Sequence, residues 1–437
     1  MASDFLHNNM KNFIYTILLS GTVGFADAQI NRQLDAITPG EVRRIETVLS
    51  SDAMEGRKVF SPAIDRAAAF IAGEFSKAGL QPLTGAKNFM QDFVMVRVKS
   101  ISASATFDGV ASESKNILAF TSQPDLNLNE NSGYSLAEIT KGASFGQEVM
   151  KYVNSGKSYV VFVDTSFAGT FPRLARRNGQ AFKSGHSVVF VLGNLHPRKF
   201  NISTRQEVTE QKLANVVGML PGKTNPDEYV IFSGHYDHLG IGNPVNGDSI
   251  YNGANDDAAG TTAVIMLANY YKKLNNNNRT LVFVAFTAEE VGGFGSQYFS
   301  RQLDPAKVVA MFNLEMIGTE SNWGKNSAYI TGYEKSDMGK ILQRNLDGTP
   351  FKFYPDPYPQ QNLFYRSDNA TLAMLGVPAH TISTSKMDAE PNYHKVTDEI
   401  STLDIDNMAE IVKAIALSAQ TIISGKDTPT RVTSVLP

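Results

Sequence analysis

The fold is decided by the stretch YVIFSGHYD at residues 229–237. Its first five residues, 229–233, offer apolar or small side chains to both faces of a strand, which is typical of a strand buried at the centre of a sheet. His235 and Asp237 follow at the point where that strand ends. The stretch therefore predicts a central strand that delivers polar side chains at its carboxyl end.

Segments on either side repeat this arrangement. Helices are predicted within 39–80 and at 258–274, 336–346 and 405–423. Further strands are predicted at 93–98, 216–220, 281–286, 308–314, 328–331 and 379–382. Strands that alternate with helices predict an α/β fold, a three-layer α/β/α sandwich with a mixed, mainly parallel central sheet. In such sheets, ligands bind outside the carboxyl ends of the strands.

The region 99–205 differs from this pattern. Ser, Asn and Gly become frequent, and strands such as 158–163 and 187–192 are separated by polar loops. We interpret it as an inserted β-rich subdomain. It would divide the α/β domain into a first part at 29–98 and a second part at 206–437, which carries the residues of chemical interest.

The first 28 residues show the pattern of a secretory signal peptide. Lys11 precedes an apolar run at 13–25, and Ala-Asp-Ala follows at 26–28. The run is shorter than the ~20 apolar residues of a spanning helix. The pattern predicts export, to a secreted or periplasmic location, without stable membrane insertion; the alternative is an amphipathic first helix of the folded domain.

Composition excludes several classes of function. The formal net charge is −3, which gives no basic face for nucleic acid. Because the chain has no cysteine, a disulfide, a thiolate zinc site and a cysteine nucleophile are all impossible. Any metal ion must therefore be held by His, Asp and Glu.

Acidic and histidine side chains follow five separate segments of the predicted α/β domain, mostly where strands end. Because the carboxyl ends of parallel strands meet at one edge of a sheet, we expect these side chains to lie together. Clustered carboxylates repel one another and are costly to desolvate, and a divalent cation is the usual remedy. The residues are His235, Asp237, Asp256, Asp257, Glu289, Glu290, Glu315 and His394.

The donor types favour one kind of chemistry. Two imidazoles with carboxylates and no thiolate suit Zn²⁺, with Mn²⁺ or Co²⁺ as alternatives. Two metal ions about 3.5–4 Å apart that share a carboxylate and a water form a common hydrolytic design. A carboxylate outside the coordination shell can accept the proton of that water.

Five motifs occur in a fixed order: SGHYDHLG at 233–240, GANDDAAG at 253–260, TAEEVG at 287–292, NLEMIG at 313–318 and YHKVTD at 393–398. This series resembles the co-catalytic zinc aminopeptidase family of clan MH, whose relatives include glutamate carboxypeptidases and glutaminyl cyclases. The resemblance covers about 206–425 and the helices before the insertion. Within the insertion, the order of segments loosely resembles a protease-associated domain, and an unrelated β insertion is an equal alternative.

The resemblance implies two Zn²⁺ per chain and assigns a ligand role to five of these residues. His235 would bind one metal, Asp256 would bridge both, and Glu290 would be a further ligand. Glu315 would complete one site and His394 the other. The family most often has Asp where this chain has Glu315, which is one methylene longer.

Three further roles follow from the resemblance. Glu289 would be the general base, and Asp237 would hold the second ring nitrogen of His235. Tyr393 would donate a hydrogen bond to the tetrahedral oxyanion.

Neighbouring polar residues have plainer interpretations. Asp257 reads as a helix N-cap and His238 as a support for its loop, so neither is assigned as a ligand. His380 lies in an apolar strand and reads as a core residue. Arg366 either contacts substrate or forms a structural salt bridge.

The function that the resemblance implies is an aminopeptidase that hydrolyses N-terminal residues from peptides. One alternative is a glutaminyl cyclase, which tends to carry Trp just before its last His; here Tyr393 stands there, and the only tryptophan is Trp323. A glutamate-carboxypeptidase-like peptidase would need basic residues in the pocket, and Arg366 is the one candidate. A non-catalytic binding protein is the remaining alternative.

Overall fold

The computed structural model describes residues 34–174 and 180–434. Its contacts divide the chain into two units, one formed by Met1–Gln91 with Ala214–Pro437 and the other by Asp92–Leu213. We call them the α/β unit and the β-rich unit. The predicted signal peptide, 1–28, lies outside the described residues.

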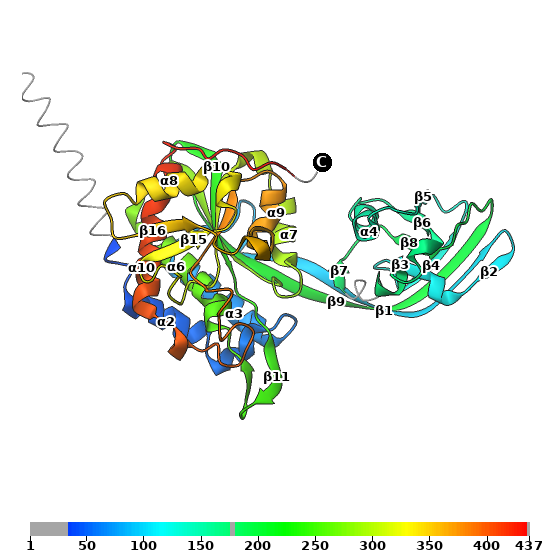
Figure 1. The fold of residues 1–437 in the computed structure, drawn as a ribbon, viewed down its shortest axis with the longest axis horizontal. Helices are drawn as coiled ribbons and strands as arrows, with labels where there is room; N and C mark the ends of the chain where they lie inside the picture. Colours follow the sequence, from blue (N-terminus) through cyan, green and yellow to red (C-terminus); the bar gives the residue numbers. More distant parts are fainter. Residues whose placement is uncertain (1–33, 175–179, 435–437) are drawn as a thin grey trace, which may run out of the picture. The chain divides into compact units, whose positions relative to one another are not determined.

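A mixed sheet forms the centre of the α/β unit (Figure 1). Its strands follow the order β16-β15-β17-β14-β10-β13-β9. Four of its neighbouring pairs are parallel and two are antiparallel, which confirms the predicted mixed, mainly parallel sheet. The strands are β9 (Phe200–Leu220), β10 (Asn225–His235), β13 (Arg279–Phe286), β14 (Val308–Leu314), β15 (Ser327–Ile330), β16 (Lys352–Pro355) and β17 (Ala379–Ser383).

The strand β10 lies at the centre, as its sequence predicts. It pairs in parallel with β13 on one side and β14 on the other, so that Phe232 lies opposite Phe283 and Phe312. The ring of Phe232 stacks on those two rings with centroid distances of 5.7 and 4.9 Å. Each such pair adds about 0.5–1.5 kcal/mol to simple burial. The aromatic row therefore fixes the register of the three strands that carry the site.

Helices cover both faces of this sheet (Figure 1). On one face, Phe232 packs in a core with α2, α3, α6, α8, α10 and α11. On the other face, the adjacent residue Ile231 packs with α7 and α9. Alternate strand residues thus enter opposite cores, which makes the three layers. The helices are α2 (Pro39–Leu49), α3 (Pro62–Ala78), α6 (Ala259–Leu274), α7 (Phe294–Arg301), α8 (Met338–Asn345), α9 (Asn369–Met374), α10 (Ile405–Ser418) and α11 (Gln420–Ile423).

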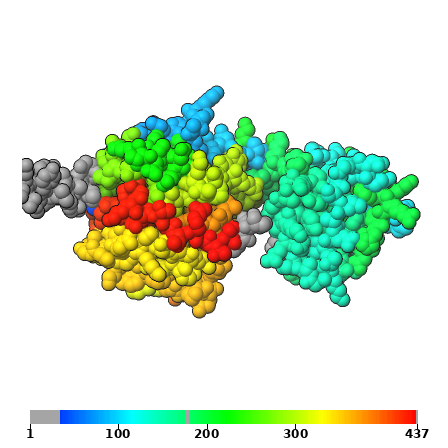
Figure 2. Space-filling model, turned by 90° about the horizontal axis from the view of Figure 1, so that it is seen from above, coloured from blue at the N-terminus to red at the C-terminus, as the bar shows by residue number. Residues whose placement is uncertain are grey.

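Local sequence signals explain where some helices begin and end. Thr38 caps α2 by accepting from the Glu41 backbone N–H. Gly79 ends α3 in the left-handed conformation, with φ of 76°. The C-terminal residues, coloured red, lie against segments coloured yellow (Figure 2). One hydrogen bond that joins them runs from Asn345 of α8 to the carbonyl of Ser418 in α10, at 2.6 Å.

The β-rich unit has a four-stranded sheet in the order β3-β8-β6-β5, with cores on its two faces. Its strands β6 and β8 match the strands predicted at 158–163 and 187–192. The likeness to a protease-associated domain stays a prediction. The bounds are β1 (Met90–Phe107), β2 (Val110–Ser112), β3 (Ile117–Phe120), β4 (Asp125–Asn129), β5 (Ser135–Ile139), α4 (Phe145–Val153), β6 (Tyr159–Val163), β7 (Gln180–Phe182) and β8 (Val188–Leu192).

Within the described ranges, 34–174 and 180–434, no helix is long and apolar enough to cross a membrane.

Candidate metal centre

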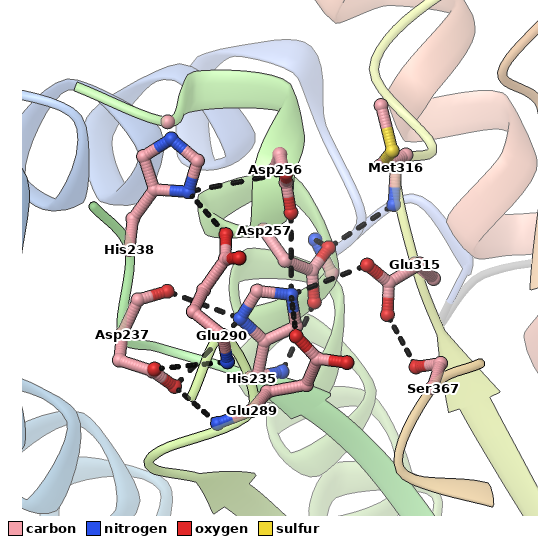
Figure 3. Close-up of polar contacts among 12 residues, drawn as sticks. His235, Asp237, His238, Asp256, Asp257, Glu289, Glu290, Glu315, Met316 and Ser367 are labelled. Atoms are coloured by element: carbon pink, nitrogen blue, oxygen red, sulfur yellow. Dashed lines mark hydrogen bonds and ion pairs between the residues drawn. The ribbon is translucent and has the colours of Figure 1, made fainter. Parts of the chain in front are cut away.

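The predicted site residues meet at the carboxyl ends of the central strands and in the loops that follow them. Figure 3 shows His235, Asp256, Glu290 and Glu315 among them. His235 is the last residue of β10, and Glu315 directly follows β14. Asp256 lies in a turn, Ala254–Ala258, that leads into α6. Glu290 follows β13, and His394 lies in the loop after β17. The side chains form two groups that share Asp256.

The first group rests on the sheet, and we call it the sheet half. The His235 Nε2 atom lies 3.2 Å from Asp256 Oδ1 and 3.2 Å from Glu315 Oε1. The His235 side chain is 1% exposed.

The second group rests on loops, and we call it the loop half. The His394 Nε2 atom lies 3.2 Å from Asp256 Oδ2 and 3.2 Å from Glu290 Oε2. The two oxygens of Asp256 thus face different histidines, as a bridging carboxylate requires.

These residues fit a pair of divalent cations. Ligand atoms about 2.0–2.1 Å from a tetrahedral zinc ion lie about 3.3 Å from one another, close to the four 3.2 Å separations. The Oδ2 atom of Asp256 is also buried and makes no hydrogen bond within the described structure. A buried carboxylate oxygen that faces His394 without a hydrogen bond is what a cation would stabilise.

The electrostatics of the cluster support the same conclusion. Close contacts with the carboxylates of Asp256 and Glu290 raise the pKa of His394 to about 10. Burial raises the pKa of Glu290, but hydrogen bonds from His238 and His394 outweigh it and bring that pKa to about 2. Asp256, whose pKa is also lowered, and Glu290 are therefore ionised and favour a protonated His394. A divalent cation would take the place of those protons.

Glu289 has a different environment. Burial raises its pKa well above the ordinary value, and the nearby charge of Glu315 adds to the effect. Its Oε2 atom is 3.9 Å from His235 Nε2, beyond hydrogen-bond distance. The side chain therefore lies beside the two groups without belonging to either.

Asp237 holds the second nitrogen of His235, but through its backbone. The His235 Nδ1 atom is 3.0 Å from the Asp237 carbonyl oxygen and 3.8 Å from its carboxylate. The carboxylate instead accepts from the backbone N–H groups of Glu289 and Glu290, at 3.1 and 3.3 Å. Asp237 therefore orients a histidine and the Glu-Glu pair together.

Asp257 does more than cap a helix. Its carboxylate accepts from the backbone N–H groups of His235, Gly260 and Met316, at 3.0, 3.0 and 3.1 Å. His235, Asp257 and Glu315 have ligand atoms within 4.8 Å of one another. However, both Asp257 oxygens are already engaged, so Asp256 is the better ligand.

The sequence analysis did not predict the roles of Arg57 and Asp398, which position parts of the site. Arg57 is fully buried and donates to the carbonyls of Tyr236, Asn252 and Gly253, at 2.8, 2.6 and 2.8 Å. Asp398 accepts from the Asp256 backbone N–H at 3.0 Å. Asp398 belongs to the YHKVTD motif, a signal that could have found it; Arg57 carries no such signal.

A pocket opens over the cluster, and Glu289, Arg366 and Tyr393 lie in its wall. The ring of Tyr393 stacks on His394 with a centroid distance of 3.9 Å. An apolar part of the wall is formed by Met316, Tyr329, Leu363 and Met387.

His380, predicted as a core residue, lies away from this cluster. It is 1% exposed, and its ring nitrogens lie 2.8 Å from the Thr331 carbonyl and 2.7 Å from Ser336 Oγ.

An α/β/α sandwich that brings two histidines and three carboxylates together at its strand ends and adjoining loops has the donor set of a divalent-metal centre. Residues 215–419 match Peptidase family M28, in agreement with the resemblance that the motifs indicate.

Curated relatives match over a short stretch. A probable zinc metalloprotease of Pyrenophora teres f. teres is 36% identical over 108 residues, 24% of this chain and 23% of that protein. A probable zinc metalloprotease of Pyricularia oryzae is 33% identical over 112 residues, 25% of this chain and 22% of that protein. The chain thus matches less than a quarter of the length of these relatives.

Solved structures match over most of the chain. The aminopeptidase of Aneurinibacillus sp. strain AM-1 has a TM-score of 0.52 and 18% identity, covering 94% of this chain and 97% of that one. A zinc aminopeptidase of Bacillus subtilis has a TM-score of 0.52 and 16% identity, covering 90% and 97%. These likenesses confirm the predicted fold.

Proposed function

We propose that this protein is a zinc-dependent exopeptidase, most specifically an aminopeptidase that hydrolyses N-terminal residues from peptides. The observation that carries the proposal is the position of Asp256, whose two oxygens each lie 3.2 Å from a different histidine. The family match and the aminopeptidases of similar fold support it.

Zinc bound by the two halves would lower the pKa of a water molecule and polarise the scissile carbonyl. Glu289 would accept the proton of that water, because burial raises its pKa and so makes it a stronger base than an exposed glutamate. Glu289 would then pass the proton to the leaving amine. Asp237 accepts a hydrogen bond from the backbone N–H of Glu289 and so fixes where the Glu289 side chain starts.

Two features of the pocket fit an N-terminal substrate. Glu289 and Glu315 line it and would attract a free α-ammonium group. Tyr329, Leu363 and Met387 would contact the side chain of a neutral or apolar first residue. Tyr393 lies in the same wall, where its hydroxyl would donate to the oxyanion.

The proposal includes two zinc ions per chain and export of the mature protein to a secreted or periplasmic location. The glutaminyl-cyclase and glutamate-carboxypeptidase alternatives are not favoured by the family match or by the relatives of similar fold.

Hydrolysis of a panel of aminoacyl-p-nitroanilides tests the proposal. We expect cleavage that a chelator abolishes, that zinc restores and that Glu289→Gln suppresses. Glu113→Gln, an exposed glutamate of the β-rich unit, is the matched control and should cleave normally. Lack of cleavage by folded, zinc-loaded protein across the whole panel would contradict the aminopeptidase proposal.

A further inference from the structure

We propose that Ser367 and His238 are a matched pair of positioning residues, one for each half of the metal centre. Each donates a hydrogen bond to one oxygen of a terminal carboxylate, Glu315 or Glu290, so that only the other oxygen remains for the metal. The inference rests on the proposed metal centre and adds how this chain controls its coordination.

In the sheet half, the hydroxyl of Ser367 donates a hydrogen bond to Oε2 of Glu315. The Ser367 Oγ to Glu315 Oε2 distance is 2.5 Å, whereas Oε1 faces His235 (Figure 3). The hydroxyl proton must point to Glu315, because Asn313 Nδ2 already donates to Ser367 Oγ at 2.8 Å. Ser233 fixes Asn313 in turn, by donating to its Oδ1 at 2.7 Å. This chain of bonds has one direction and ends on Glu315.

In the loop half, His238 forms a hydrogen bond with Oε1 of Glu290. The His238 Nδ1 to Glu290 Oε1 distance is 2.8 Å (Figure 3). The other oxygen of Glu290, Oε2, faces His394 at 3.2 Å. An ionised carboxylate only accepts, so Nδ1 carries the proton. The ring is fully buried and packs on Gly253, where a Cβ would lie 2.5 Å from two ring atoms. The glycine therefore makes room for the donor.

Distances separate this role from that of a metal ligand. The ligand atoms of His238, Asp256 and Glu290 lie within 4.8 Å of one another, so His238 is a geometric candidate. However, its Nδ1 atom lies 2.8 Å from Glu290 and 3.9 Å from Asp256. The first distance is that of a hydrogen bond and is shorter than the ~3.3 Å between two zinc ligands. His394 has 3.2 Å to both carboxylates and fits the ligand role.

The consequence concerns coordination number. Each half offers one imidazole nitrogen, one oxygen of Asp256 and one free oxygen of a glutamate. Three protein ligands would leave a further position for water or substrate, as catalytic zinc sites require. Ser367 also accounts for the unusual residue at 315, because it holds the longer side chain of Glu315 by the oxygen that faces away from His235.

Zinc affinity tests the proposal without measuring peptidase activity. Full-length apoprotein would be titrated with zinc in competition with a chromogenic chelator, and circular dichroism would establish that each variant is folded. We expect Ser367→Ala to weaken one of the two zinc equivalents about 10–100-fold, as loss of an orienting partner typically does. In a Glu315→Asp background, where the shorter carboxylate no longer reaches Ser367, the same substitution should change the affinity less than about threefold.

His238 is tested by a conservative pair. His238→Asn places an amide N–H where Nδ1 was and should keep zinc affinity within about tenfold, whereas His238→Ala should lose about 10–100-fold. His238→Leu replaces the alanine variant if that protein does not fold. His394→Ala removes a proposed ligand and so shows how much zinc affinity is lost when a ligand is absent.

Several results would overturn the proposal. Unchanged zinc affinity in Ser367→Ala and His238→Ala would show that neither residue positions a ligand. Equal losses in His238→Asn, His238→Ala and His394→Ala would make His238 a ligand. An equal effect of Ser367→Ala in both backgrounds would remove the link to Glu315. If the wild-type protein bound no zinc at all, the metal centre itself would fail, which separates that outcome from the others.

Discussion

The two halves of the metal centre rest on different parts of the fold. The sheet half is built on adjacent central strands, since β10 ends at His235 and pairs with β14, which Glu315 follows. The loop half joins Glu290, after β13, to His394, whose side chain is 36% exposed and whose φ is 56°. The sheet half is therefore positioned by the core of the protein, and the loop half by local hydrogen bonds. The predictions below test this difference, from the largest effect to the smallest.

The largest effect is expected at Glu289, which neither half contains. Glu289→Gln keeps the shape of the side chain but cannot accept a proton, so kcat should fall about 10²–10⁴-fold. Zinc content should not change, because Glu289 is not a ligand. Elemental analysis beside steady-state kinetics checks both parts, and a loss of zinc in this variant would make Glu289 a ligand.

The next effect is expected at Tyr393 on the loop half. Tyr393→Phe removes the hydroxyl and keeps the ring that stacks on His394. If the hydroxyl stabilises the oxyanion, kcat should fall about 10²–10³-fold with little change in KM. A rise in KM alone, measured with an aminoacyl-p-nitroanilide, would assign Tyr393 to ground-state binding.

A pH effect is expected in the sheet beside the first half. His380 of β17 lies opposite Phe312 of β14, and burial lowers its pKa to about 4. The unfolded chain, with a histidine pKa near 6.5, therefore binds more protons between pH 6.5 and 4. The stability that neutral His380 contributes is fully present above pH 6.5 and is lost as the pH falls toward 4, by about 3 kcal/mol at most.

Urea unfolding at several pH values between 7 and 4 measures this contribution. His380→Gln should flatten the pH dependence relative to the wild type. His186→Gln, at an exposed histidine of the β-rich unit, should leave the curve unchanged. Identical pH profiles for wild type and His380→Gln would show that another group controls acid unfolding.

The smallest effect is the difference in unfolding free energy between His235→Ala and His394→Ala in metal-free protein. His235→Ala leaves a cavity and an unpartnered Asp237 carbonyl, whereas His394→Ala changes a partly exposed loop. The free energy of unfolding in urea with chelator should fall by roughly 1–3 kcal/mol more for His235→Ala. Equal losses for the two variants would mean that the sheet does not preorganise its half.

The sequence predicted the strands and the ligands because both have local signals. The apolar strand 229–233 and the residues that follow it are contiguous, so the position of His235 at a sheet edge could be predicted. The same holds for Glu315 after β14. The fold was confirmed and residues 215–419 match the family that the motifs resemble, whereas the metal roles of these residues stay a prediction.

The parts that the sequence did not give depend on contacts between distant segments. Arg57 donates to Tyr236, which lies 179 positions away. Ser367 donates to Glu315, 52 positions away. The orientation of Asp237, which holds His235 by a carbonyl and the Glu-Glu pair by a carboxylate, depends on loop geometry. Such partners have no periodicity or spacing that could reveal them.

The most direct test of the central claim is the number of zinc ions per chain. Dialysed full-length protein would be analysed for bound zinc by atomic emission, beside Glu315→Ala from the sheet half and His394→Ala from the loop half. If Asp256 bridges two independent halves, the wild type should hold two zinc ions and each variant one. A wild-type protein with a single zinc ion that both variants retain would contradict the account.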